Sequence, residues 1–447
     1  RTNYHLFKIL ITVGKIMKKF KVLIAIVGAL ILTGCGQQNP AHEVFEEELA
    51  LSKLNPKNIW THVTFLADDA MEGRDTGSQG HLIAGNYVQS QFSLMGLKPI
   101  GGKSFIHPIP FRSTQLEENG ASVTLVFDSS EFPGLASDLY MLKFLEDFLT
   151  FGSAVGENLS VTAPLVFAGF GTTATNFNYD DYKNIDATGK IVIVISGGPQ
   201  SLPSDYSAHF GSTQTLIENA ADHGAVGIIF ISSTAREARL PWERMKNFIT
   251  RPSLTWVGSD GNVGSGNPQI KAGITIKKDV AKKIFEFSGL NFEKIFANAE
   301  NGDVRSFELK GEATISTKSK HSTLDSFNVI SVLEGTDPVL KDEYVIYTAH
   351  LDHIGITHGG EGDLINNGAY DNATGVSIML ETARLMSMPE NRPKRSVIFA
   401  AVTAEEKGLL GSAYMAKYPP VSAKKIIANV NIDMPILAGP TKDIIAW

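Results

Sequence analysis

Three apolar runs in the last third of the chain, 344–349, 396–404 and 428–432, each stop at an acidic residue or a histidine. The residues are His350 and Asp352 after the first run, Glu405 and Glu406 after the second, and Asp433 after the third. Such runs are typical of parallel strands buried on both faces, and ligands of open α/β folds gather at the carboxyl ends of strands. With Asp371 on the first crossover, the pattern predicts a metal site at one edge of a sheet.

Each of these residues alone has a simpler explanation. A lone His350-x-Asp352 is most often a surface pair, and Asp371 before a helix is most often a cap. The adjacent acids Glu405 and Glu406 would ordinarily begin a solvated helix. Asp433 is harder to explain, because an acid that closes an apolar strand needs a partner or a bound cation. Only the combination at one sheet edge favours a metal site.

The donor types indicate hydrolytic metal chemistry. Nitrogen and oxygen donors without sulfur fit zinc best, with cobalt or manganese as alternatives. A carboxylate such as Asp371 can bridge two cations roughly 3.5–4 Å apart. Glu406 can bind metal while Glu405 accepts a proton from metal-activated water and returns it to a leaving amine. A carboxylate near His350, such as Asp352, typically holds the other ring N–H of the histidine.

The elements that position these residues follow a βαβ pattern from residue 328. Strands are expected at 328–333, 344–349, 396–403 and 425–433, and helices at 372–388 and 411–417. Apolar residues in the first helix follow helical spacing. We therefore expect an α/β fold with an open, mostly parallel sheet and helices on both faces.

The preceding part of the chain predicts two helices and a separate module. The helices are expected at about 56–66 and 81–95, and the second is stopped by the Gly-Leu-Lys-Pro sequence at 96–99. Buried strands near 164–168, 190–195 and 224–231, with a helix at 216–223, indicate a small α/β module rich in β-strand. Its glycines do not form a Gly-x-Gly-x-x-Gly loop, which argues against nucleotide binding. Between residues 112 and 156 only a strand at 122–127 is indicated, and 140–151 fits either strand or helix.

Composition excludes several classes of protein. A chain of 447 residues allows two or three domains. The net charge of −7 and the lack of a basic block beyond the N-terminus argue against a nucleic-acid partner. The single cysteine, Cys35, excludes a disulfide framework and a cysteine-based zinc site.

The N-terminal segment resembles a bacterial lipoprotein signal. A basic stretch from Met17 precedes the apolar run 22–32, which is too short for a comfortable membrane span. Leu32-Thr33-Gly34-Cys35 then matches a lipobox. This predicts cleavage before Cys35, lipidation of that residue and a membrane-anchored protein that faces the periplasm or exterior. An uncleaved anchor and an ordinary secretory signal are the alternatives.

The order of the motifs resembles a known family. His-x-Asp at 350, Gly-Ala-x-Asp-Asn-x-x-Gly at 368, Glu-Glu at 405 and Asn-x-Asp at 431 are similar to the di-zinc aminopeptidases, which include bacterial leucyl aminopeptidases and relate to glutamate carboxypeptidase. The segment 67–78 resembles the opening Glu-Gly-Arg motif of larger bacterial members. The module at 164–231 resembles their protease-associated (PA) domain.

The resemblance implies a role for each residue. His350 and Asp433 would bind one zinc ion and Glu406 the other, with Asp371 bridging them before a candidate cis peptide bond to Asn372. Glu405 would be the general base and Asp352 would orient His350. His353 matches no ligand role. The remaining ligand in this family is a histidine far beyond the Asn-x-Asp strand, so we expect it past Trp447 and expect the catalytic domain to be truncated.

The expected division of the chain follows from these matches. It is 1–16 extraneous or untranslated, 17–34 signal peptide, 35–50 tether, 51–155 N-terminal part of the peptidase domain, 156–315 PA domain and 316–447 catalytic domain. The implied function is removal of N-terminal residues from peptides with two zinc ions. The alternatives are a non-catalytic binding protein of the same fold and a single-zinc transferase that resembles glutaminyl cyclase.

Overall fold

The computed structural model describes residues 52–102, 104–127, 139–249, 251–357, 359 and 361–435. The described residues from Pro56 onward belong to one compact unit. Cys35, the predicted signal segment and the tether lie outside the described residues. Among the residues described, no helix is long and apolar enough to cross a membrane.

Three parallel strands form the part of the sheet that carries the predicted site. β15 (Ile426–Asn431), β13 (Tyr344–His350) and β14 (Ser396–Val402) are neighbours in that order. Both pairings with β13 are parallel, so the three carboxyl ends lie at the same edge. β14 then pairs antiparallel with the end of β12 (Phe307–Leu333). Every residue of β14 is buried, as expected for a strand covered on both faces.

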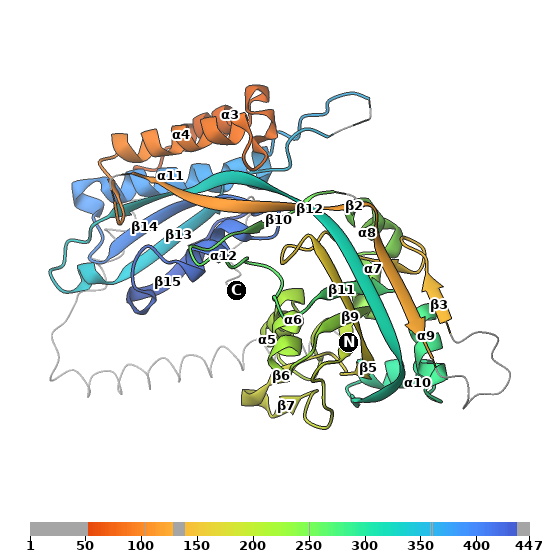
Figure 1. The fold of residues 1–447 in the computed structure, drawn as a ribbon. Coiled ribbons are helices and arrows are strands. Elements are labelled where there is room, and N and C mark those ends of the chain that lie inside the picture. Colours follow the sequence, from red (N-terminus) through yellow and green to blue (C-terminus); the bar gives the residue numbers. More distant parts are fainter. Residues whose placement is uncertain are drawn as a thin grey trace, which may run out of the picture. The chain divides into compact units, whose positions relative to one another are not determined.

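Helices cover both faces of β13 and β14. α3 (Pro56–Leu66), α4 (Gln79–Leu94) and α11 (Thr374–Ser387) lie over one face (Figure 1) and pack through a single apolar core that includes Leu66, Phe92 and Met379. On the other face α12 (Leu410–Lys417) contributes Met415 to a second core with Ile346. The predicted α/β class with helices on both faces is confirmed.

Two long strands extend the same sheet. β12 pairs along its length with β2 (Ile106–Val126), antiparallel, and with β5 (Asn158–Phe167) over its first half. The predicted domain boundary at residue 316 lies within β12. Only the last six residues of β12 and the end of β2 match predicted strands, because serine, threonine and charged residues interrupt the apolar alternation along both strands.

The predicted module has a parallel core of its own. β5, β8 (Ile191–Ser196), β9 (Gly227–Ser232) and β11 (Ala272–Ile276) pair in parallel and in that order, and β4 (Phe148–Leu149) closes the row antiparallel. The predicted helix at 216–223 is α6 (Thr213–Asp222). The helices that the sequence analysis left unassigned are α5 (Ser204–Phe210), α7 (Thr234–Arg239), α8 (Trp242–Ile249), α9 (Lys278–Phe287) and α10 (Phe292–Glu300). The remaining strands are β1 (Lys98–Pro99), β3 (Leu139–Leu142), β6 (Thr173–Ala174), β7 (Tyr179–Asp180) and β10 (Ser253–Trp256).

Candidate metal centre

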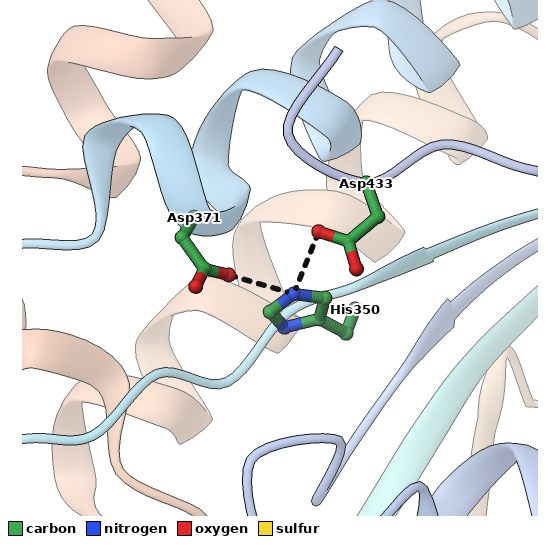
Figure 2. A group of neighbouring side chains, drawn as sticks. All are labelled: His350, Asp371 and Asp433. Carbon is green, nitrogen blue, oxygen red and sulfur yellow. Dashed lines mark ion pairs between the residues drawn. The ribbon is translucent and has the colours of Figure 1, made fainter. Parts of the chain in front are cut away.

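His350 is the centre of the site at the carboxyl end of β13. Its side chain is 3% exposed, and its Nε2 lies 2.9 Å from Asp371 Oδ1 and 3.4 Å from Asp433 Oδ1 (Figure 2). Despite these distances, Nε2 is buried without a hydrogen bond to any residue that the structure describes. Burial would lower the pKa of His350, but the carboxylates of Asp352, Glu405 and Asp433 outweigh it and raise the pKa. The ring nitrogen therefore points into a group of acidic oxygens that does not satisfy it.

Asp352 holds the strand ends together. Its side chain is fully buried and accepts hydrogen bonds from the amides of Glu405 and Glu406, at 3.1 and 3.3 Å, and from the Thr76 hydroxyl at 3.2 Å. His350 Nδ1 donates to the carbonyl oxygen of Asp352 at 3.0 Å, whereas the carboxylate oxygen is 4.0 Å away. Asp352 thus contacts His350 as expected, but through its main chain. Its carboxylate fixes the Glu405–Glu406 turn instead.

The Asp371–Asn372 peptide bond is cis, as the family resemblance implies. Asn372 Nδ2 donates to the Ile432 carbonyl at 2.9 Å, and Asn372 Oδ1 accepts from the Gly375 amide at 3.0 Å. Gly375 must lack a side chain, because a Cβ there would lie 2.2 Å from Asn372 Oδ1. Asn372 therefore holds the segment before Asp433 beside the start of α11, which places two acids against His350.

Glu405 and Glu406 follow a tight turn at the end of β14. Ala404 is buried with a φ of +54°, the left-handed region that is strained for a residue with a Cβ. Glu405 Oε2 lies 3.9 Å from His350 Nε2. Burial raises the pKa of Glu405; His350 opposes this rise, and the neighbouring carboxylates of Glu406 and Asp352 add to it. A carboxyl group with a raised pKa suits proton transfer near neutral pH.

His353 forms a second group with Glu406 and Asp371. His353 Nδ1 lies 2.6 Å from Glu406 Oε1, and a donor atom from each of the three residues falls within 4.8 Å of the others. The hydrogen bond from His353 lowers the pKa of Glu406. The sequence analysis gave His353 no role. Its position three residues after His350, in the loop that follows the same strand, could have indicated that it lies at the site.

The described residues contain two groups of three or more side chains that could hold a metal ion. They are His350, Asp371 and Asp433, and His353, Asp371 and Glu406. The first fits a divalent cation because the buried Nε2 of His350 has no hydrogen-bond partner while acidic oxygens face it. Asp371 belongs to both groups.

The structure thus brings His350, Asp352, Asp371, Glu405, Glu406 and Asp433 to one place. In the segment that resembles the Glu-Gly-Arg motif, Arg74 is buried and donates to main-chain carbonyls, whereas Glu72 is exposed.

Comparison with known proteins supports a peptidase sequence in this region. Residues 328–447 match the model of Peptidase family M28. Aminopeptidase NAALADL1 of Mus musculus is 30% identical over 141 residues, 30% of this chain and 17% of its own length. Aminopeptidase YwaD of Bacillus subtilis is 27% identical over 286 residues, 63% of this chain and 46% of its own. The chain therefore spans less than half the length of either relative.

Solved structures of aminopeptidases also resemble the chain. An aminopeptidase from Aneurinibacillus sp. strain AM-1 has 22% identity and a TM-score of 0.44, over 87% of this chain and 72% of its own. A zinc aminopeptidase from Bacillus subtilis has 21% identity and a TM-score of 0.35, over 85% and 69%. The segment 328–447, which contains each predicted metal-binding residue, thus matches peptidase family M28 in sequence.

Proposed function

We propose that the protein is a zinc-dependent aminopeptidase that hydrolyses N-terminal residues from peptides. The observation that carries the proposal is the buried Nε2 of His350, which faces Asp371 and Asp433 without a hydrogen bond. A buried polar atom without a partner is costly, and a cation among these oxygens would remove that cost. The match of this segment to peptidase family M28 supports the same function.

His350, Asp371 and Asp433 would hold one zinc ion, and Asp371 and Glu406 would hold part of a second site. Because Asp371 is common to both groups, the arrangement favours a two-metal hydrolase over a single-zinc transferase. Bound zinc would supply a Lewis acid that polarises the scissile carbonyl and acidifies water. Cobalt and manganese accept the same nitrogen and oxygen donors and are expected to substitute.

Glu405 would carry the proton. Its carboxylate is near His350 but belongs to neither group of candidate ligands, so it remains available as a base. It would accept a proton from the attacking water and transfer it to the amine that leaves. Asp352 would keep Glu405 in place through the hydrogen bond from the Glu405 amide.

The direct test is Glu405→Gln in the full-length protein. Glutamine keeps the size of the side chain but cannot accept the proton, so we expect hydrolysis of aminoacyl chromogenic substrates to fall by about 10²–10⁴-fold. Zinc content, measured by mass spectrometry of the metal, should stay the same. Near-normal turnover would remove Glu405 from this role. Glu390→Gln, in a turn after α11, is the control and should leave turnover unchanged.

We further propose that Cys35 is lipidated and anchors the protein to a bacterial membrane, facing the periplasm or exterior. The lipobox at residues 32–35 supports this location. Cys35→Ser should release the protein from the membrane fraction of cells that express the natural gene. Membrane retention of the Cys35→Ser protein would contradict a lipid anchor at that residue.

A further inference from the structure

Arg74 is a buried arginine whose hydrogen bonds go to the main chain. Its side chain is among the largest fully buried ones, and the residue is 1% exposed. Nε donates to the Leu351 carbonyl at 2.9 Å, and Nη2 donates to the Gly368 carbonyl at 2.9 Å. Nη1 donates to the carbonyls of Leu66 and Asn367, the latter at 2.7 Å. The planar guanidinium thus joins three separate segments of the chain.

Two of these segments carry the candidate metal ligands. Leu351 lies between His350 and Asp352, so its carbonyl marks where the chain leaves β13. Asn367 and Gly368 precede the cis peptide bond at Asp371. Arg74 therefore fixes the distance between the segment that presents His350 and the segment that presents Asp371. Leu351 and Gly368 lie 277 and 294 residues after Arg74 in the sequence.

The main chain around Arg74 packs against the same loops. The Arg74 carbonyl accepts from the His353 amide at 3.2 Å, and the Gly73 carbonyl accepts from the Gly355 amide at 3.1 Å. Glu72, Gly73 and Arg74 all have positive φ, at 48°, 66° and 50°. Gly73 has no room for a side chain, because a Cβ would lie 2.5 Å from the Asn366 carbonyl oxygen. Strain of this kind persists only where surrounding contacts impose it.

The charge of Arg74 also faces the site. Burial lowers the pKa of Arg74 to about 10, opposed by the carboxylates of Asp352, Asp371 and Glu406. The guanidinium is therefore a cation at neutral pH. Thr76, two residues on, donates its hydroxyl to Asp352 Oδ2 at 3.2 Å. The short segment 72–76 thus contacts the metal-site loops through both main chain and side chains.

We propose that residues 72–76, through Arg74 and Thr76, position the metal centre from a part of the chain that the family match does not include. Arg74 is a positioning residue: its guanidinium donates to main-chain carbonyls, and through them it sets the separation of His350 and Asp371. Thr76 sets the orientation of Asp352. This role rests on the proposed metal centre. Residues 72–76 would hold His350 and Asp371 at the separation that a bound cation requires.

The test compares Arg74→Lys with Arg112→Lys in the full-length protein. Lysine keeps the charge at position 74 but cannot reproduce the planar set of donors. Arg112 also donates to a carbonyl, that of Ala154 at 2.7 Å, but lies in β2 outside the site. The probe is Co²⁺ alone, whose affinity is measured by competition with a chromophoric chelator and whose visible spectrum reports its coordination.

We expect R74K to bind Co²⁺ about 10–100-fold more weakly, the range for outer contacts of metal ligands, with a changed visible spectrum. R112K should match the wild type in both. Thermal unfolding without metal is measured for each variant to establish that it is folded. Thr76→Val, which loses one hydrogen bond, is the second variant. It should change the visible spectrum and weaken Co²⁺ binding, in both cases by less than R74K does.

Wild-type affinity and spectrum in both R74K and T76V would overturn the positioning role. If R74K does not fold, T76V decides alone, with the same two readouts. Absence of Co²⁺ binding by the wild-type protein would overturn the metal centre itself. Normal binding and hydrolysis by the wild type, together with unchanged variants, would overturn the role of residues 72–76 and leave the proposed function intact.

Discussion

Two sets of parallel strands in this sheet end in different chemistry. β13, β14 and β15 lead to His350, to Glu405 and Glu406, and to Asp433. The carboxylates of Glu405 and Asp433 lie 3.9 and 3.4 Å from His350 Nε2, and Glu406 contacts His353. β8 and β9 of the module lead to serines. Ser196 donates to the Ile231 carbonyl at 3.2 Å, and Ser233 caps α7 by accepting from the Arg236 amide.

The comparison shows that parallel strand ends alone do not make a site. In the module the strand ends carry hydroxyl groups: Ser196 has a hydrogen-bond partner, whereas the buried Ser232 Oγ has none among the described residues. The buried acid of that region, Asp181, accepts from the amides of Phe170 and Thr172 at 3.0 and 3.1 Å. At the other set of strand ends the buried nitrogen of His350 has no such partner. What distinguishes the two regions is the kind of polar group: histidine nitrogens and carboxylates that could hold a cation lie at one set of strand ends, and serine hydroxyls at the other.

The largest expected effect comes from removing the acid common to both ligand groups. Asp371→Asn keeps the shape of the side chain but removes its negative charge. A change in an outer contact already costs about 10–100-fold in metal affinity, so loss of a shared ligand should cost more and lower the zinc content of the isolated protein. Metal analysis of the purified variant measures this. Ser196→Ala, at the end of β8, should leave zinc content unchanged; a full zinc complement in Asp371→Asn would contradict a bridging role.

A smaller effect is expected when Glu406 loses its histidine. His353→Ala removes the contact at 2.6 Å that holds Glu406. A zinc titration should show a tighter site, assigned to His350, and a weaker site, assigned to Glu406. We expect the affinity of the weaker site to fall about 10–100-fold and the affinity of the tighter site to stay the same. His321→Ala, which removes a contact to the Ser153 carbonyl in the module, is the matched control. If the titration is unchanged, His353 has no part in the second group.

The buried acid of the module should make stability depend on pH. Burial raises the pKa of Asp181 to about 7, opposed by the hydrogen bonds from Thr172 and Phe170. Since the folded state holds this proton more tightly than the unfolded state, its stabilising contribution is present below pH 4 and is lost as pH rises to about 7. Asp181→Asn should therefore gain stability relative to wild type across that range, by a few kcal/mol at about 1.4 kcal/mol per pKa unit.

Chemical denaturation at several pH values measures the difference in unfolding free energy between Asp181→Asn and wild type. The expected difference grows between pH 4 and pH 7 and is constant above. A difference that does not change with pH would show that Asp181 is ionised in the folded protein throughout this range.

The smallest effect is expected at the surface of the module. Lys190 Nζ lies 2.7 Å from Glu308 Oε1, and the side chains are 21% and 56% exposed. A double-mutant cycle with Lys190→Ala and Glu308→Ala should give about 0.2–1 kcal/mol, because exposed ion pairs are screened and cost side-chain entropy. A coupling free energy above about 2 kcal/mol would exceed the range for exposed ion pairs and would show that this pair stabilises the packing of the module against β12.

Much of the metal-bearing sheet could be predicted because β14 is fully buried and β13 is mostly buried, whereas β15 is largely exposed among the described residues. The runs ending at His350, Val402 and Asn431 are apolar enough to mark strands, and parallel pairing then brings their ends together. α11 was predicted at 372–388 and observed at Thr374–Ser387, since its apolar residues follow one face. The long strands β2 and β12 were mostly missed, because one face of each is partly exposed and polar.

The supporting contacts could not be predicted from local pattern. Arg74 meets Leu351 across 277 positions, and its partners are carbonyl oxygens, which every residue type provides. The position of Asp352 relative to Glu405 likewise depends on main-chain amides at the turn after β14. Residue types indicated which side chains carry chemistry; the contacts that orient them depend on the path of the backbone.

The most direct test of the metal centre is a crystal structure of the zinc-loaded, full-length protein with anomalous data at the zinc edge. We expect two anomalous peaks that share Asp371, one bound by His350 and Asp433 and the other by Glu406. The absence of a peak beside His350 Nε2, in protein that binds zinc in solution, would show that His350 does not bind the metal.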